Sequence, residues 1–393
     1  MFFQDLGRVL RQNIREYGMY IALFAIMVIF TITTNGLFLS PRNLSNLFNQ
    51  SGYIAVLAVG MTLVIVIRCI DLSVGFLGGF LGAVAAIMLL SWNLPVYLVI
   101  PLVLGLGIVA GMITAYPIAV LGIPSFVASL AGWLIYRGLI GVVTSGTGTI
   151  IISDNIYNAI GNGFIPDIPG LTFLPEVHKL TMILGIVAVV LYIRSALSSR
   201  RKKQAYNFEV MPRSIFILQL ILVAAIILGV TWVLAGYNGL SWTLIVVLIV
   251  VGIYQFITTQ TVLGRHIYAV GGNPEAAELS GISVKRVTFI VFASMGMLAA
   301  LAGILFSSRL QSATTTAGTL WELDAIAAAY VGGVSAAGGV GSVVGSLIGA
   351  LVMISLTNGM NLMGIDANVQ YIVRGFVLAA AVIFDVTTRR SAK

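Results

Sequence analysis

A carboxylate and a hydroxyl, Asp71 and Ser73, interrupt a long apolar run of the chain. Only a few residues are available for a turn there, so the sequence predicts a break between two helices. Both types of side chain can cap a following helix, and an ionisable group at membrane depth is a candidate functional group. Two interpretations are open: the two residues line a polar substrate pathway, or they only cap a helix at the cytoplasmic edge of the membrane.

A second acidic pair, Glu322 and Asp324, opens a short apolar segment that ends in a glycine-rich turn at residues 332–341. This pattern predicts a short, broken helix, and such helices are tolerated at membrane depth where they line a cavity. We therefore expect Glu322 and Asp324 to form a second wall of the pathway, with Asp71 and Asp324 beside one polar route.

Several kinds of catalysis are excluded by what the sequence lacks. His178 and His266 are the only histidines and fall in loops on opposite sides of the predicted membrane, so we expect neither a metal centre nor a Ser-His-Asp triad within it. No lysine follows a glycine, so the phosphate-binding G-x-x-x-x-G-K-[ST] loop is absent. We expect no catalytic residue, no metal site and no bound cofactor. A single cysteine, Cys69, permits no intrachain disulfide.

The composition is that of a membrane protein. Of 393 residues, 59% are hydrophobic and 9% are charged, and the mean hydropathy is +1.06, whereas soluble domains carry about 25% charged residues. The net charge of +8 could suggest nucleic acid, but the cations stand in short runs between apolar stretches, without the interleaved aromatic residues of a nucleic-acid site. Charge asymmetry across a bilayer explains them better, so we expect membrane lipid and no nucleic acid around this chain.

The sequence predicts an all-α fold, a polytopic bundle of membrane helices with about twelve crossings. A crossing helix needs about 20 apolar residues. The predicted spans are residues 17–34, 51–70, 75–91, 96–119, 125–143, 179–197, 214–234, 241–259, 287–307, 323–336, 341–357 and 370–386. The segment 323–336 is short, but without it the C-terminal arginines would lie on the outer side.

Lysine and arginine orient the bundle, because they favour the cytoplasmic side of short loops. Arginines precede the first span, and alternate counting places most other cations on the same side, so both termini are predicted to be cytoplasmic. The predicted organisation is an N-terminal segment at 1–16, either an amphipathic surface helix or an unstructured tail, one transmembrane domain at 17–386 and a cytoplasmic tail at 387–393. Glycines four residues apart indicate close helix packing, as at Gly345 and Gly349.

Two loops are long enough to do more than connect spans. We expect the acidic outward loop at 144–178 either to dock an external protein or to act as a passive cover. The inward loop at 260–286 contains a short helix, which Asn273 and Pro274 begin and Gly281 ends. So short a helix is unstable alone, so either a partner protein or the ends of the chain's own spans must hold it. Its residues are Asn273, Pro274, Glu275, Ala276, Ala277, Glu278, Leu279, Ser280 and Gly281.

The chain resembles the membrane permeases of ABC importers for monosaccharides, of the ribose, xylose and galactose type. The resemblance covers nearly the whole chain and is carried by residues 60–63, 70–75, 124–126, 137–138, 264–282 and 322–328. Together these motifs are highly specific. The additional spans at 179–197 and 214–234 are similar to the longer xylose branch, whereas Arg68 and Cys69 depart from the small or acidic residues expected before Ile70.

The resemblance implies an importer of the bacterial inner membrane in which two permeases, two cytoplasmic ABC ATPases and an extracytoplasmic sugar-binding protein act together. Residues 273–281 would be the coupling helix that contacts the ATPase, and ATP and Mg²⁺ would be bound by that ATPase. The two permeases are expected to be a homodimer. The substrate would be a monosaccharide such as xylose, galactose, glucose or arabinose.

A second class of function is an ion-coupled secondary transporter of a small polar solute. Such a transporter would need an intramembrane acid or base pair on facing helices, and Asp71 with Asp324 is the only candidate pair. A third class, an intramembrane enzyme, lacks a plausible catalytic set. Vesicle uptake driven by internal ATP, compared with uptake after an ionophore collapses the ion gradient, separates the first two classes.

Overall fold

The computed structural model describes residues 14–145, 148–169, 177–208 and 210–390. Almost all elements are helices, and nine helices of the described part are long and apolar enough to cross a membrane. The predicted fold class, a polytopic helical membrane bundle, is confirmed. The predicted amphipathic segment at 1–16 lies outside the described residues except for its last three residues, which begin the first helix.

Twelve helices of the described chain correspond to the twelve predicted spans. They are α2 (Ile14–Thr33), α3 (Pro41–Val66), α4 (Val74–Leu90), α5 (Val96–Ala119), α6 (Ser125–Thr144), α8 (Lys179–Ala205), α9 (Arg213–Ala235), α10 (Trp242–Gln260), α13 (Val284–Leu310), α14 (Trp321–Val331), α15 (Val343–Leu362) and α16 (Ala367–Arg390). The largest difference is at α3, which begins well before the predicted span. Ser40 caps it by accepting from Asn43 N at 3.4 Å, and Pro41 is suited to the first helical position.

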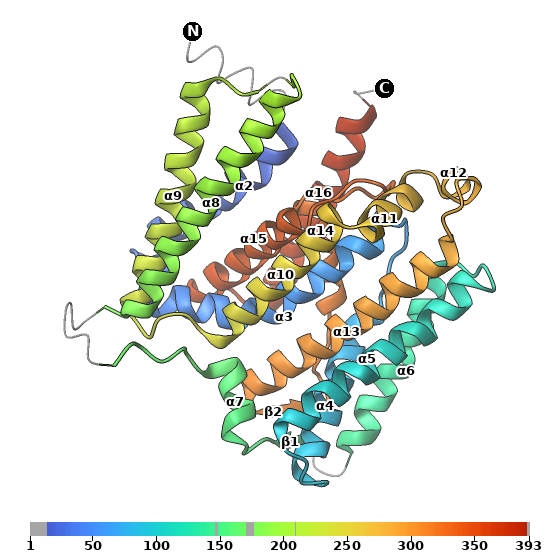
Figure 1. Cartoon of the computed structure of the whole chain (residues 1–393). Helices are drawn as coiled ribbons and strands as arrows, with labels where there is room; N and C mark the ends of the chain where they lie inside the picture. The colour runs from blue at the N-terminus through green and yellow to red at the C-terminus, as the bar shows by residue number, and fades with distance from the viewer. Residues whose placement is uncertain (1–13, 146–147, 170–176, 209, 391–393) are drawn as a thin grey trace.

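The arrangement of the ends agrees with the predicted sidedness. The first residues of α2, the connection between α8 and α9 and the last turns of α16 lie at one end of the bundle, together with α11 (Val262–Gly272) and α12 (Pro274–Leu279) (Figure 1). Lys202 and Lys203 stand in the last turn of α8 at this end. The strands β1 (Thr149–Ile151) and β2 (Ser312–Thr314) and the helix α7 (Asn155–Asn162) lie at the opposite end.

The core forms around α3, which is mostly buried, and α13, which packs against α3, α4 and α5. Backbones touch directly at glycines: a Cβ at Gly107 would collide with the carbonyl of Gly296, and one at Gly349 would collide with the carbonyl of Ala328. The glycine rows therefore serve close packing within the chain, as predicted.

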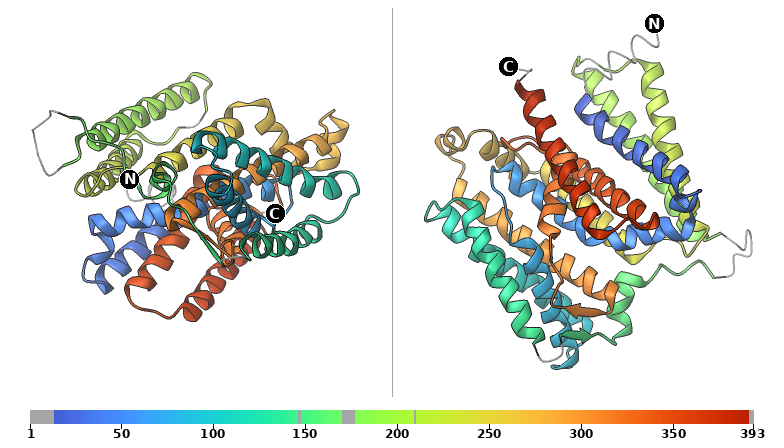
Figure 2. Two further views of the ribbon diagram at one scale, coloured as in Figure 1. Left: turned by 90° about the horizontal axis from the view of Figure 1, so that it is seen from below. Right: turned by 180° about the vertical axis from the view of Figure 1, so that it is seen from behind.

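The helices α8 and α9 form a pair at the edge of the bundle. They pack chiefly on each other, with Gly185 against Thr231, and α9 also contacts α3. Both views of Figure 2 show this pair standing beside the remaining helices. Most of its side chains are exposed and apolar, which is the composition of a lipid-facing surface.

The outward loop at 144–178 is anchored to the bundle over its described residues. β1 pairs antiparallel with β2, placing Thr149 opposite Thr314. Asp154 caps α7 by accepting from Tyr157 N at 2.8 Å, and Arg309 of α13 donates to Asn162 Oδ1 at 2.6 Å. The loop thus includes a small folded unit at the outward end.

Candidate functional site

The first predicted break lies between α3 and α4. Residues 67–73 are not helical, and Asp71 and Ser73 within them are buried. Asp71 Oδ1 accepts from Ser73 N at 2.9 Å and from Ser73 Oγ at 2.6 Å. Neither side chain accepts from an amide of the first turn of α4 among the described hydrogen bonds. Asp71 and Ser73 therefore do not cap α4 with their side chains. Asp71 instead stabilises the non-helical segment that precedes it.

The start of α6 holds this break in place. Ile70 N donates to Ser125 Oγ at 3.0 Å, and Ser129 Oγ donates to the carbonyl of Ile70 at 3.3 Å. One turn further along α6, the side chain of Ser73 lies beside Gly132. The hydroxyls of α6 thus satisfy backbone groups that a broken helix leaves without partners.

The second break brings Glu322 against the first. Glu322 stands in the first turn of α14 and is only 4% exposed. Its Oε1 accepts from Trp133 Nε1 of α6 at 3.0 Å, whereas its Oε2 has no hydrogen-bond partner within the described chain. Oε2 lies against Gly75, where any side chain would collide with it. A buried carboxylate oxygen therefore faces the first turn of α4, the positive end of that helix.

Aromatic rings close one side of this cluster. Trp133 meets Phe76 edge to face, with 4.9 Å between ring centroids. The guanidinium of Arg137 lies 5.2 Å from the ring centroid of Trp133 and 5.9 Å from that of Phe76. Arg137 belongs to a motif that the sequence indicates, and here it is a cation stacked behind the indole that binds Glu322.

Asp324 lies on the other side of α14, because residues two apart on a helix do not face the same way. Arg374 of α16 donates to its Oδ2 at 3.0 Å and its Oδ1 at 3.2 Å, and stacks on Tyr371 at 4.8 Å. The four predicted site residues thus divide: Asp71, Ser73 and Glu322 surround the start of α4, whereas Asp324 is ion-paired to α16. Arg374 is the only cation in the predicted span 370–386, and its pairing with Asp324 is not among the expectations from the sequence.

The inward helix α12 has the predicted ends. Asn273 accepts from Ala276 N at 3.1 Å, and Gly281 has a φ of 85° just after the helix. Its side chains divide between the two interpretations of what holds it. Ala277 is buried against the chain itself, whereas Leu279 is 91% exposed. Ala277 thus ties the helix to its own chain, whereas Leu279 presents a large apolar side chain on the surface.

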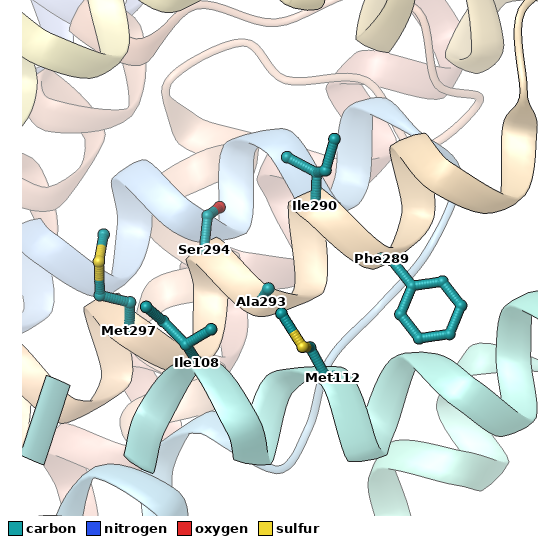
Figure 3. Close-up of a pocket in the computed structure, with 7 residues that line it drawn as sticks. All are labelled: Ile108, Met112, Phe289, Ile290, Ala293, Ser294 and Met297. Carbon is teal, nitrogen blue, oxygen red and sulfur yellow. The ribbon is translucent and has the colours of Figure 1, made fainter. Parts of the chain in front are cut away.

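A groove of about 290 Å³ lies between α5 and α13 and is distinct from this cluster. Its lining is apolar except for one hydroxyl: Ile108, Met112, Phe289, Ile290, Ala293, Ser294 and Met297 (Figure 3). Ser294 Oγ donates to the carbonyl of Val291 at 3.0 Å. Such a lining has almost nothing to offer a polar solute, so the groove is not the polar pathway.

Comparison with known proteins places the chain in a family. Residues 43–382 match the family described as branched-chain amino acid transport system / permease component. The xylose transport system permease protein XylH of Haemophilus influenzae is 40% identical over 378 residues, which cover 96% of this chain and 98% of the relative. XylH of Escherichia coli K12 is 40% identical over 380 residues, covering 96% and 93%.

The ribose import permease protein RbsC of Haemophilus influenzae is 35% identical over 373 residues, covering 94% of this chain and 93% of the relative. No solved structure matches the chain. The family match and these nearly full-length identities agree with the multi-pass bundle of membrane helices that the structure shows. The chain belongs to this family of transport-system permease components, which are membrane subunits of transporters and not enzymes.

Proposed function

We propose that this chain is the permease subunit of an ATP-driven, binding-protein-dependent importer of monosaccharides. Its relatives are named as permeases for xylose and ribose, and its motifs resemble those of monosaccharide ABC permeases. Pentoses are therefore the first substrates to test, with galactose, glucose and arabinose next. In this role the protein lies in the bacterial inner membrane.

The observation that carries the proposal is the buried carboxylate oxygen of Glu322. Glu322 Oε2 has no partner in the described chain and lies where two broken helices meet, beside the indole of Trp133. A sugar presents hydroxyl donors and apolar C–H faces, which suit a carboxylate acceptor and an aromatic ring. Asp71 and Ser73 extend the polar surface along the start of α4. Both carboxylates are nearly inaccessible here, so substrate reaches them only after the bundle opens.

The two ends of the bundle present surfaces that suit the two proposed partners, the ABC ATPase and the sugar-binding protein. At the cytoplasmic end α12 is the coupling helix, and Leu279 enters the surface of an ABC ATPase, which binds ATP and Mg²⁺ in place of any cofactor on this chain. At the outward end Ile151 and Ile156 are 73% and 72% exposed, and they form the apolar part of a docking surface for the sugar-binding protein. Two identical permeases pair with two ATPases as a homodimer.

Asp324 enters the proposal differently from the other three predicted residues. Its carboxylate pairs with Arg374, so a neighbouring cation already compensates its charge. This pairing disfavours Asp324 as one half of the acid pair that an ion-coupled transporter requires. Asp324 instead fixes the short helix α14, and through it the position of Glu322.

The test is reconstitution of this permease with its ATPase and sugar-binding protein in proteoliposomes. We expect ATP-dependent xylose uptake that an ionophore does not abolish. Glu322→Gln should lower uptake about tenfold, since a hydrogen bond to a charged group is replaced by a weaker one. Asp366→Asn, at the outward start of α16, serves as the matched control. Uptake that follows an ion gradient without ATP, or a Glu322→Gln variant with wild-type uptake, contradicts the proposal.

A further inference from the structure

Three chain segments meet by direct backbone contact at the cytoplasmic end of the described bundle. They are the end of α3, the end of α11 and the glycine-rich loop between α14 and α15. Gly339 N donates to the carbonyl of Val66 at 2.9 Å. A Cβ at Gly271 would collide with that same carbonyl, and one at Gly338 would collide with the side chain of Arg68. These contacts bring the three segments into close packing around the end of α3.

Arg68 connects the segments with its side chain. Its Nε donates to the carbonyl of Gly271 at 2.7 Å, and its Nη2 donates to the carbonyl of Gly272. These are the last two carbonyls of α11, which a helix leaves without partners of its own and which carry the negative end of its dipole. A guanidinium satisfies both at once because its donors form a fixed fork.

The backbone of Arg68 has a conformation that is unfavourable for an arginine. Its φ is 63°, in the left-handed region that favours glycine. The surrounding hydrogen bonds are those of a helix end closed by such a residue: Cys69 N donates to the carbonyl of Val64 at 3.0 Å, and Arg68 N donates to that of Ile65 at 2.9 Å. An arginine where glycine fits best points to a use for its side chain.

The position of Arg68 in the chain links the proposed coupling helix to both breaks. Gly272, which accepts from Arg68, directly precedes Asn273, the cap of α12. Arg68 itself stands three residues before Asp71 in the same non-helical segment. The loop on the third side leads back through α14 towards Glu322, and Tyr268 of α11 donates to the carbonyl of Gly341 in it at 2.8 Å.

We propose that Arg68 is a positioning residue that transmits movement of α12 to the two broken helices. The proposal rests on the proposed function. When α12 moves with its ATPase, the carbonyls of Gly271 and Gly272 move with it, and the guanidinium carries the Asp71 segment along. The glycine loop, bonded to Val66, moves in the same step. Figure 1 shows the non-helical segment running from beside α11 down to α4.

The decisive variant is Arg68→Gly. Glycine keeps the left-handed helix end and removes the whole side chain of Arg68, guanidinium included, so the fold is expected to persist with a thermal unfolding temperature close to that of the wild type. ATPase association and basal ATP hydrolysis should also be unchanged. The sugar transported per ATP should fall about tenfold, within the range that single residues of a coupled network produce. Arg68→Lys, which keeps the charge and can reach one carbonyl, should lose less. Arg201→Ala, at the cytoplasmic end of α8, is the control.

A second readout does not require sugar. In a Cys69→Ser background, the variant Ser73→Cys is treated with a small water-soluble thiol reagent with and without ATP. With Arg68 present, we expect its rate of labelling to depend on nucleotide; with Arg68→Gly, the rate should be the same in both states. Nucleotide-dependent labelling that persists in Arg68→Gly, a wild-type ratio of sugar to ATP, or loss of ATPase association would overturn the proposal. A wild-type complex that shows nucleotide-dependent labelling but transports no sugar would refute only the proposed substrate.

Discussion

Replacing Arg374 with methionine removes the guanidinium that pairs with Asp324 and keeps an unbranched side chain. The two side chains are 18% and 19% exposed, and their closest nitrogen and oxygen atoms are 3.0 Å apart. At an effective dielectric constant of about 20, that separation gives an attraction of about 5.5 kcal/mol. Removing one partner of a buried pair leaves the other charge without compensation, so Arg374→Met is expected to lower the free energy of unfolding by about 3–5 kcal/mol.

The double variant Asp324→Asn with Arg374→Met separates the cost of an unpaired charge from the worth of the pair. It leaves no charge at this position, and replacing a buried ion pair by neutral groups is often close to neutral. We therefore expect the double variant to be more stable than either single variant. The deviation from additivity should be several times the roughly 0.5 kcal/mol found for independent sites.

The measurement is equilibrium unfolding in mixed micelles, followed by helical circular dichroism, for the wild type, both single variants and the double variant. Arg201→Met, on the exposed cytoplasmic end of α8, controls for the loss of an arginine as such and should change the free energy by less than about 0.5 kcal/mol. The reasoning is refuted if Arg374→Met costs less than about 1 kcal/mol, or if the double variant loses the sum of the two single losses.

Three further predictions concern single residues. Leu279→Asp should abolish co-purification of the ATPase without changing thermal unfolding, because Leu279 is 91% exposed; unchanged co-purification would remove α12 from the partner interface. Gly75→Ala should lower the free energy of unfolding by about 1–3 kcal/mol, because the added Cβ would collide with the carboxylate of Glu322 and with the carbonyl of Gly318. Gly138→Ala is the control: its Cβ would meet nothing within 4 Å, so it should be tolerated in the same unfolding assay. The amide of Leu180 and neighbouring amides hold the pKa of Asp167 well below its usual range. The stabilisation by Asp167 is therefore complete above the unfolded pKa of about 3.9 and is lost as pH falls towards the folded pKa. Asp167→Asn should lower the unfolding temperature at pH 7, and its unfolding temperature should differ less from that of the wild type below about pH 4. A difference in unfolding temperature that does not depend on pH would contradict this account.

The spans could be predicted because they depend on properties that are local in the sequence. Apolar length identifies a crossing, and the positions of the cations indicate which ends of the helices lie together. Even the short helix α14 was predicted, since the sidedness of the C-terminal arginines required one more crossing. The ends of α12 were equally readable from Asn273 and Gly281, because capping depends on residues within one turn.

The partners of the buried charges could not be predicted, because contacts between distant segments set them. Trp133 reaches Glu322 across 189 positions of sequence, and nothing local to either residue indicates the other. The division between Glu322 and Asp324 was more accessible. Residues two apart on a helix lie on opposite faces, so the spacing alone argued against both carboxylates facing one pathway. Arg374, the only cation of the predicted span 370–386, was the available signal for the partner of Asp324.

The contact between Gly75 and Gly318 bears on how the breaks can open. A Cβ at Gly75 would collide with the carbonyl of Gly318, and a Cβ at Gly318 would collide with the carbonyl of Gly75. The two backbones therefore touch with no side chain between them that could adjust by changing its rotamer. A displacement of the start of α14 must move the start of α4 by a similar amount or separate the two chains. Separation of the two backbones would expose Glu322 Oε2 to water, whereas joint movement would keep it covered. The contact between Gly75 and Gly318 can therefore both close the polar cluster and decide when it becomes accessible.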